Sequence, residues 1–263
     1  MGLLSTTNLT IRFGGHVAVN AVSCDFHPGT LTAIVGPNGA GKTTYFNLIS
    51  GQLKATGGSV TLNGRNLSAM SASARTRAGL GRAFQLTNLF PHLTVLENVR
   101  LAVQATQAGP HRRGFSLLSI WSDHKALLTR SEEILESIAL IDKSGSMVAS
   151  LPHGDQRKLE VAMLMALKSQ VFMFDEPTAG MSAGEVPAVL NLIRQLREDK
   201  SKTILLVEHK MDVVRELADR IVVLHDGALV ADGKPAEVIA SKLVQEAYLG
   251  VRDQQDKVPV VET

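Results

Sequence analysis

A short apolar run followed by a glycine-rich loop most constrains what this chain can fold into. Residues 31–35 read LTAIV and stop at GPNGAGKTT, residues 36–44, which contains the pattern G-x-x-x-x-G-K-[ST]. Residues 43–49 then show helical periodicity. Strand, glycine loop and helix in this order indicate a phosphate-binding loop, because glycine lets the backbone turn tightly and aim its N–H groups at an anion. The sequence therefore predicts a nucleotide-binding α/β fold.

The residue types in this loop suit nucleotide chemistry. Lys42 stands where an ammonium group reaches the β and γ phosphates, and Thr43 offers a hydroxyl to Mg²⁺. The alternative is a glycine-rich turn that only caps a helix, and the strand and helix on the required sides argue against it. The predicted nucleotide-binding segment consists of Gly36, Pro37, Asn38, Gly39, Ala40, Gly41, Lys42, Thr43 and Thr44.

A second feature is a pair of acids at the end of a predicted strand. Residues 171–177 read VFMFDEP. Neighbouring residues on a strand point to opposite faces, so Asp175 and Glu176 can do different jobs. One can hold a Mg²⁺ shell, and the other can deprotonate a water that attacks the γ-phosphate. A solvated acidic strand end is the alternative, and the phosphate loop in the same chain disfavours it.

The pattern along the chain indicates one domain with an inserted helical part. A β-rich segment surrounds the phosphate loop and includes Asn63-Gly64, a strong hairpin signal. After residue 168 strands alternate with helices, which predicts a parallel sheet, and Asp226-Gly227 predicts a further hairpin. We expect residues 1–250 to form the domain, about 68–168 its helical subdomain, and 251–263 a flexible tail.

Charge and composition exclude several function classes. The 27 basic and 25 acidic residues give a net charge of +2, which is too balanced for electrostatic capture of nucleic acid. Cys24 is the only cysteine, so an internal disulfide and a multi-cysteine metal site are excluded. No apolar run reaches the roughly 18 residues that a membrane-spanning helix needs.

The segment LPHGDQRKLE, residues 151–160, heads a predicted helix and admits three interpretations. A metal site from His153 and Asp155 lacks further nearby ligands. An ordinary helix cap is the second interpretation. Half of a phosphate site is the third, because the N-terminus of a helix attracts anions. The segment alone does not decide between the last two.

Six segments together carry a resemblance to a known family. The chain resembles the ATP-binding subunit of ABC transporters over nearly its whole length, with the family's motifs in the family's order. The resemblance implies an α/β fold of the P-loop NTPase class, an ABC cassette with a parallel-sheet core, an antiparallel β-subdomain and an inserted helical subdomain. It also implies ATP and Mg²⁺ as cofactors. The segments are GPNGAGKTT, AFQ at 83–85, LPHGDQRKLE, VFMFDEP, TAGMS and LLVEH.

The resemblance implies a role for each matching residue. Phe13, in IRFGG, is similar to the aromatic residue that stacks on adenine, although a core position in the β-subdomain is the alternative. Gln85 resembles the glutamine that senses Mg²⁺ and the attacking water and links to the membrane subunit. His209 resembles the switch histidine that contacts the γ-phosphate. The implied catalytic residues are Glu176, His209 and Gln85, and the implied Mg²⁺ ligands are Thr43, Gln85 and Asp175.

LPHGDQ stands where the family usually has L-S-G-G-Q, the signature that completes the nucleotide site of the opposite subunit. Leu151 and Gly154 match this pattern, whereas Pro152, His153 and Asp155 replace serine, glycine and glutamine. Proline supplies neither a hydroxyl nor an N–H, and Asp155 brings a negative charge near phosphate. The Gly154 N–H remains available, and His153 could add a donor. We therefore expect weakened but not abolished hydrolysis at this site.

Further likenesses point to a subfamily. FGGHVAVN, the long segment before the signature, G-D-Q-R-K-L-E and EAYLG resemble importers of branched-chain and related amino acids. A second departure is Ser182, where the family often has the aspartate of a cross-dimer contact. Leu89 and Phe90 are candidates for docking a membrane subunit or for packing the helical lobe, and Trp121 for a partner contact or a packing anchor.

The resemblance also implies an assembly. It consists of a homo- or heterodimer of cassettes, two transmembrane permease subunits and a substrate-binding protein, without nucleic acid, at the cytoplasmic face of the inner (plasma) membrane. The alternatives are a urea or amide importer, a lipopolysaccharide-type exporter, a soluble non-transport ABC ATPase and a phosphate-loop kinase. The kinase would need neither the signature nor His209.

Overall fold

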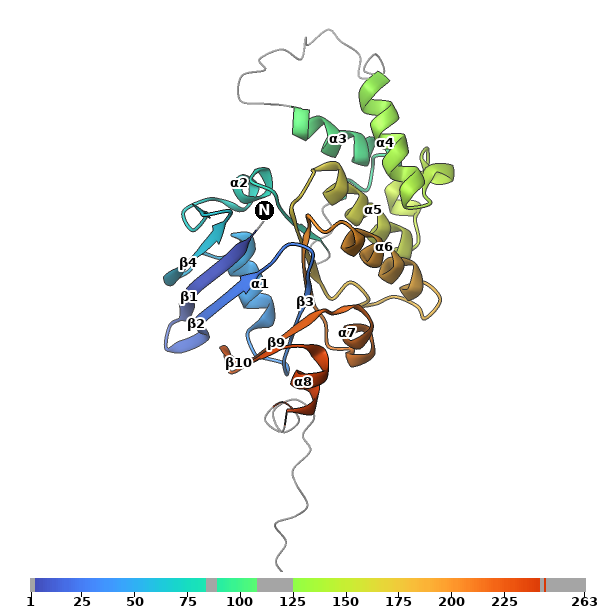
Figure 1. The fold of residues 1–263 in the computed structure, drawn as a ribbon. Helices are drawn as coiled ribbons and strands as arrows, with labels where there is room; N and C mark the ends of the chain where they lie inside the picture. The colour runs from blue at the N-terminus through green and yellow to red at the C-terminus, as the bar shows by residue number, and fades with distance from the viewer. Residues whose placement is uncertain (1–2, 84–88, 108–124, 242–243, 245–263) are drawn as a thin grey trace, which may run out of the picture.

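Two β-sheets and the helices around them make up the fold. It is taken from a computed structural model that describes residues 3–83, 89–107, 125–241 and 244 (Figure 1). In the described residues the strands are β1 Leu4–Phe13, β2 His16–Phe26, β3 Leu31–Val35, β4 Gly57–Leu62, β5 Arg65–Asn66, β6 Leu80–Ala83, β7 Val171–Asp175, β8 Thr203–Val207, β9 Arg220–His225 and β10 Ala228–Gly233. The helices are α1 Lys42–Ser50, α2 Ala72–Arg77, α3 Val95–Gln107, α4 Lys125–Ser137, α5 His153–Ala166, α6 Val186–Glu198, α7 Met211–Leu217 and α8 Pro235–Ala240.

The larger sheet is the predicted parallel core. Its strand order is β10-β9-β3-β8-β7-β6, and all its strands except the edge strand β10 run parallel. Every residue of β3, β7 and β8 is buried, as expected for central strands covered on both faces. The edge strand returns through a turn at Asp226 and Gly227, whose φ angles of 48° and 74° confirm the second predicted hairpin.

The smaller sheet is antiparallel, with the order β2-β1-β4-β5. Its β4–β5 hairpin turns at Asn63 and Gly64, whose φ angles are 54° and 76°, so the first hairpin prediction is also confirmed. Helix α1 lies between the two sheets (Figure 1). Its buried Tyr45 and Phe46 share one hydrophobic cluster with Leu4 of β1 and Leu205 of β8. The phosphate loop is therefore anchored in the main core.

The opposite face of the parallel sheet carries α5, α6 and α7. Leu159 of α5 and Ile193 of α6 pack in one cluster with Phe172 and Phe174 of β7. Helices α3 and α4 extend this layer away from the sheet (Figure 1). Two turns of 3-10 helix, Ile141–Lys143 and Val148–Ser150, connect α4 to α5.

The stretch expected to be helical, about residues 68–168, contains one element that was not predicted. Residues 80–83, LGRA, form β6, which pairs in parallel with β7 at the edge of the core sheet. Gly79, at a φ of 104°, lies between α2 and this strand. The strand was missed because four residues with a glycine and an arginine carry no alternation of apolar and polar positions. The helical part proper begins after β6.

A search for membrane spans found none in the described part of the chain. No helix there combines the length and the apolar character needed to cross a bilayer.

Candidate active site

The phosphate loop lies between the end of β3 and the start of α1, and its backbone is tightly enclosed. Gly36 has a φ of 153°, and a Cβ there would lie 2.1 Å from the carbonyl oxygen of Leu224. Gly41 has a φ of 93°, and its Cβ would lie 2.4 Å from the carbonyl oxygen of Ala18. Both positions therefore require glycine for conformational and for steric reasons. The close approach of β2 and β9 encloses the loop at the start of α1, and the N-terminus of a helix attracts anions.

Lys42 is the first residue of α1 and folds back over this loop. Its ammonium group donates to the carbonyl oxygens of Gly36, at 2.7 Å, and Pro37, at 2.9 Å. Burial lowers the pKa of Lys42, while the nearby Glu176 and Asp175 act in the opposite direction. The ammonium group thus lies inside the loop and close to both acids, so the predicted grouping of these residues is observed.

Asp175 ends β7 and is paired with an arginine that the sequence analysis did not single out. The Arg82 guanidinium lies 2.6 Å from Asp175 Oδ2, and the two side chains are only 7% and 6% exposed. Burial raises the pKa of Asp175, and Arg82 opposes this shift. Arg82 also donates to Asn47 and Ser50 of α1. Its position three residues before the AFQ glutamine was visible in the sequence, but its buried partner was not.

Glu176 follows Asp175 directly and turns away from the strand. Its φ is 50°, in the left-handed region that a non-glycine residue rarely adopts, and its N–H donates to the carbonyl oxygen of Val207 at 2.9 Å. Such backbone strain is found most often at functional positions. His209 Nδ1 lies 3.8 Å from Glu176 Oε1, and both side chains are partly exposed, at 51% and 41%. The structure thus brings together the two predicted catalytic residues, which follow β7 and β8.

Glu208 positions this pair from within the protein. It is fully buried, and its carboxylate accepts hydrogen bonds from the Thr178 hydroxyl at 2.6 Å and from the N–H groups of His209 and Lys210. One buried carboxylate therefore ties the turn after Glu176 to the turn that carries His209. Glu208 was not predicted, although its place between an apolar strand and the histidine was a signal for such a role.

The residues present fit a Mg²⁺ ion that is shared with a nucleotide. No group of three or more histidine, cysteine or acidic side chains that could hold a metal by itself occurs in the described residues. Mg²⁺ typically takes one or two protein oxygens and completes its shell with phosphates and water. The Thr43 hydroxyl at the start of α1 and the Asp175 carboxylate match that donor set. Asp175 lies close enough to Lys42 for the two charges to interact.

Phe13, the predicted adenine contact, ends β1 and is 50% exposed. A core position in the antiparallel sheet, which was the alternative, is therefore excluded.

Gln85 and Trp121 lie outside the described residues, as does the predicted tail 251–263. Of the two candidate docking residues, Leu89 is 8% exposed and belongs to the core of the helical part, whereas Phe90 is 49% exposed.

The signature segment starts α5, with Pro152 as the N-cap residue and without a side-chain cap. The Gly154 N–H, which we expected to be available, donates to Glu185 Oε1 at 3.0 Å, so that expectation is wrong for this conformation. The negative charge of Asp155 at this end of the helix is compensated, because Lys143 and Lys158 both form ion pairs with its carboxylate. Burial acts to raise the pKa of Asp155, but these two hydrogen-bonded lysines outweigh it and lower the pKa.

Leu151 is buried beside the signature, and His153 is exposed at the first position of α5. Glu185, in contrast, was missed by the sequence analysis. The spacing S-x-x-E from Ser182 to Glu185 is a capping-box signal that could have drawn attention to it.

Fold and site together define the class of protein: a phosphate-loop ATPase built as an ATP-binding cassette. A loop lysine, two acids and a histidine lie together at the carboxyl ends of the strands of the parallel sheet. The helix that begins with the signature segment, α5, lies on the face of this sheet opposite to α1. The chain belongs to the ABC transporter family, whose model matches residues 19–179. A model described as "Branched-chain amino acid ATP-binding cassette transporter" matches residues 228–254.

Curated relatives and solved structures agree with this class. The chain is 37% identical to the high-affinity branched-chain amino acid transport ATP-binding protein LivG of Escherichia coli K12, over 94% of this chain and 98% of LivG. It is 34% identical to BraF of Pseudomonas aeruginosa, which carries the same description, with the same coverage. The crystal structure of the ADP conformation of MJ1267, an ATP-binding cassette of an ABC transporter, superposes with a TM-score of 0.80 at 26% identity, covering 95% of this chain and 100% of MJ1267.

Proposed function

We propose that this chain is the ATP-hydrolysing subunit of an importer for branched-chain or related amino acids. The observation that carries the ATPase part is the meeting of Lys42, Asp175, Glu176 and His209 at the carboxyl ends of neighbouring strands. The substrate class is supported by the names of LivG and BraF and by the second family match. No observation favours the urea, lipopolysaccharide or soluble alternatives.

In this proposal each of these side chains has its own task. Lys42 exchanges its two loop carbonyls for phosphate oxygens when a nucleotide binds, and the N–H groups of residues 36–44 surround the same phosphates. Glu176 accepts the proton of the attacking water, and His209 beside it binds the γ-phosphate. Mg²⁺ held by Thr43, Gln85 and Asp175 would neutralise the charge of the phosphates. Phe13 stacks on the adenine from the end of β1.

The signature belongs to a second site. Helices α1 and α5 cover opposite faces of the parallel sheet, which supports a role for α5 toward another cassette. Dimeric structures exist for a related cassette, MJ0796, which shares 26% identity with this chain at a TM-score of 0.74. In our proposal Leu151, Pro152, His153, Gly154 and Asp155 complete the nucleotide site of a partner cassette, which is a second copy or a related ATPase.

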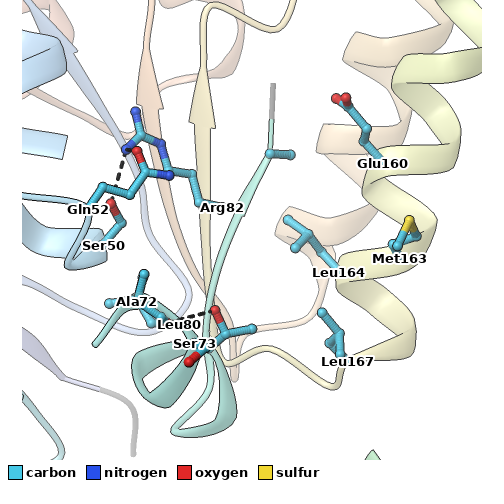
Figure 2. A pocket seen from close by; sticks show the side chains of 12 residues that line it. Ser50, Gln52, Ala72, Ser73, Leu80, Arg82, Glu160, Met163, Leu164 and Leu167 are labelled. Carbon is cyan, nitrogen blue, oxygen red and sulfur yellow. Dashed lines mark hydrogen bonds between the residues drawn. The ribbon is translucent and has the colours of Figure 1, made fainter. Parts of the chain in front are cut away.

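We propose that a pocket between α2, β6 and α5 binds a segment of a permease subunit. Its volume is about 320 Å³, and Figure 2 shows Arg82 and Ser50 on one side and Glu160, Met163 and Leu164 of α5 on the other. Strand β6 forms its wall and leads directly into the segment that contains Gln85. A cytoplasmic segment of a transmembrane subunit bound here would hold the chain at the membrane surface.

The test uses the complex as the cell assembles it. The tagged chain is purified from its native membranes in mild detergent, and its partners are identified by mass. We expect permease subunits, and we expect Glu176→Gln to leave ATP bound while turnover falls about 100-fold or more, because a general base is lost. Glu132→Gln, an exposed glutamate of α4, is the control. Normal turnover in Glu176→Gln would show that the base is assigned wrongly, and a chain recovered alone would overturn the transporter role.

A further inference from the structure

One carboxylate in this structure bridges two helix starts. Glu185 directly precedes α6, and its Oε2 accepts hydrogen bonds from the N–H of Ser182, at 3.0 Å, and from the Ser182 hydroxyl, at 2.7 Å. Its Oε1 accepts from the N–H of Gly154, the second residue of α5, at 3.0 Å. The hydrogen bonds from Ser182 and Gly154 lower the pKa of Glu185, so the side chain is anionic at neutral pH.

The start of α5 explains why a distant carboxylate binds there. The first N–H groups of a helix have no partner within the helix and carry positive partial charge. Pro152 has no side-chain acceptor for them, and the Asp155 carboxylate is bound to Lys143 and Lys158. Glu185 therefore supplies the anion that the signature sequence lacks. A Cβ at position 154 would lie 3.0 Å from Glu185 Oε1, which shows how closely the two segments pack.

We propose that Glu185 is a displaceable stand-in for phosphate, which restrains closure of the ATP-bound dimer. This rests on the proposed function, in which the Gly154 N–H binds the γ-phosphate of a nucleotide held by the partner cassette. The carboxylate and the phosphate compete for one N–H, and two anions so close repel each other. The nucleotide must therefore displace Glu185. The ATP concentration needed to close the dimer is raised by a factor that the free energy of the Glu185–Gly154 contact sets. Glu185 is a positioning residue, because it acts through the start of α5.

The test measures ATP trapped in the closed state. In the purified complex, with Glu176→Gln to prevent hydrolysis, the amount of ATP retained after gel filtration is followed against ATP concentration. We expect Glu185→Gln and Glu185→Ala to lower the half-saturating concentration about fivefold. Glu198→Gln, an exposed glutamate at the other end of α6, should leave it unchanged. Binding of a fluorescent ATP analogue to the phosphate loop of the isolated chain should be the same for all variants.

The two substitutions separate charge competition from a capping role. Glutamine keeps an oxygen that can accept from Gly154 but loses the charge, so repulsion between carboxylate and phosphate predicts a shift for both substitutions, whereas a capping role predicts one for alanine alone. If only Glu185→Ala changes trapping, or if neither does, the competition is refuted while the proposed function stands. A Glu176→Gln complex that traps no ATP at any concentration, with Glu185 either intact or substituted, would overturn both.

Discussion

At the scale of single residues, the candidate site depends on charges that are buried in specific pairs. Asp175 is held by Arg82, Glu208 by a hydroxyl and two backbone N–H groups, and Lys42 by two loop carbonyls. Each group is thus held in a defined place without its nucleotide. Glu176 and His209 are the exception, since both are partly exposed and lie 3.8 Å apart. The reacting side chains remain accessible while those that orient them are fixed.

The Arg82–Asp175 pair gives a stability prediction. Arg82→Met leaves a buried carboxylate without its cation, which should lower the free energy of unfolding by about 3 kcal/mol at neutral pH. Burial already raises the pKa of Asp175 in the folded protein, and loss of Arg82 raises it further. A carboxyl group whose pKa is higher in the folded than in the unfolded protein lowers the free energy of unfolding once it is ionised. The loss of stability in Arg82→Met should therefore grow as the pH rises toward the raised pKa of Asp175 and shrink in acid. Urea denaturation at several pH values measures it.

The matched control removes both charges. Arg82→Met combined with Asp175→Asn should recover much of the lost stability and abolish the added pH dependence, because no unpaired charge then remains in the core. Equal stability of the single variant and the wild type at neutral pH would show that the pair contributes nothing.

At the scale of elements, the start of α5 departs from the signature that the family usually has. A serine at the N-cap would satisfy a backbone N–H of the first turn, and Pro152 cannot. We predict that Pro152→Ser stabilises the protein by about 1 kcal/mol and raises ATP turnover in the assembled complex. Pro187→Ser, in the first turn of α6, is the matched control and should not raise turnover. Unchanged turnover in Pro152→Ser would show that the altered signature does not limit hydrolysis.

The elements also show what the sequence could and could not predict. The phosphate loop, the buried strands of the core and both hairpins follow from local patterns, such as glycine spacing and apolar runs, and all are present. Strand β6 was missed because its four residues become a strand only by pairing with β7. Asp175, which pairs with Arg82, and Gly154, which binds Glu185, lie 93 and 31 residues away along the chain, so no local pattern could reveal these two contacts.

At the scale of the whole molecule, Arg82 links two surfaces. Its guanidinium binds Asp175 at the nucleotide edge, and the same side chain lines the pocket between α2, β6 and α5 (Figure 2). A permease segment in that pocket would therefore press on a residue that contacts the proposed Mg²⁺ ligand. In the proposed complex this one side chain would connect the membrane partner with the nucleotide edge.

This arrangement predicts that the pocket can be blocked without harm to the nucleotide site. Ser73 is exposed at the pocket wall on α2, so Ser73→Trp should fill the space with an indole while the core stays intact. We expect the variant to bind ATP and melt like the wild type, but to lose the permease subunits on purification from membranes. Gln195→Trp fills a second surface pocket, of about 210 Å³ on α6, and should keep them. If Ser73→Trp retains its permeases in full, the docking surface lies elsewhere, and the exposed Phe90 becomes the next position to test.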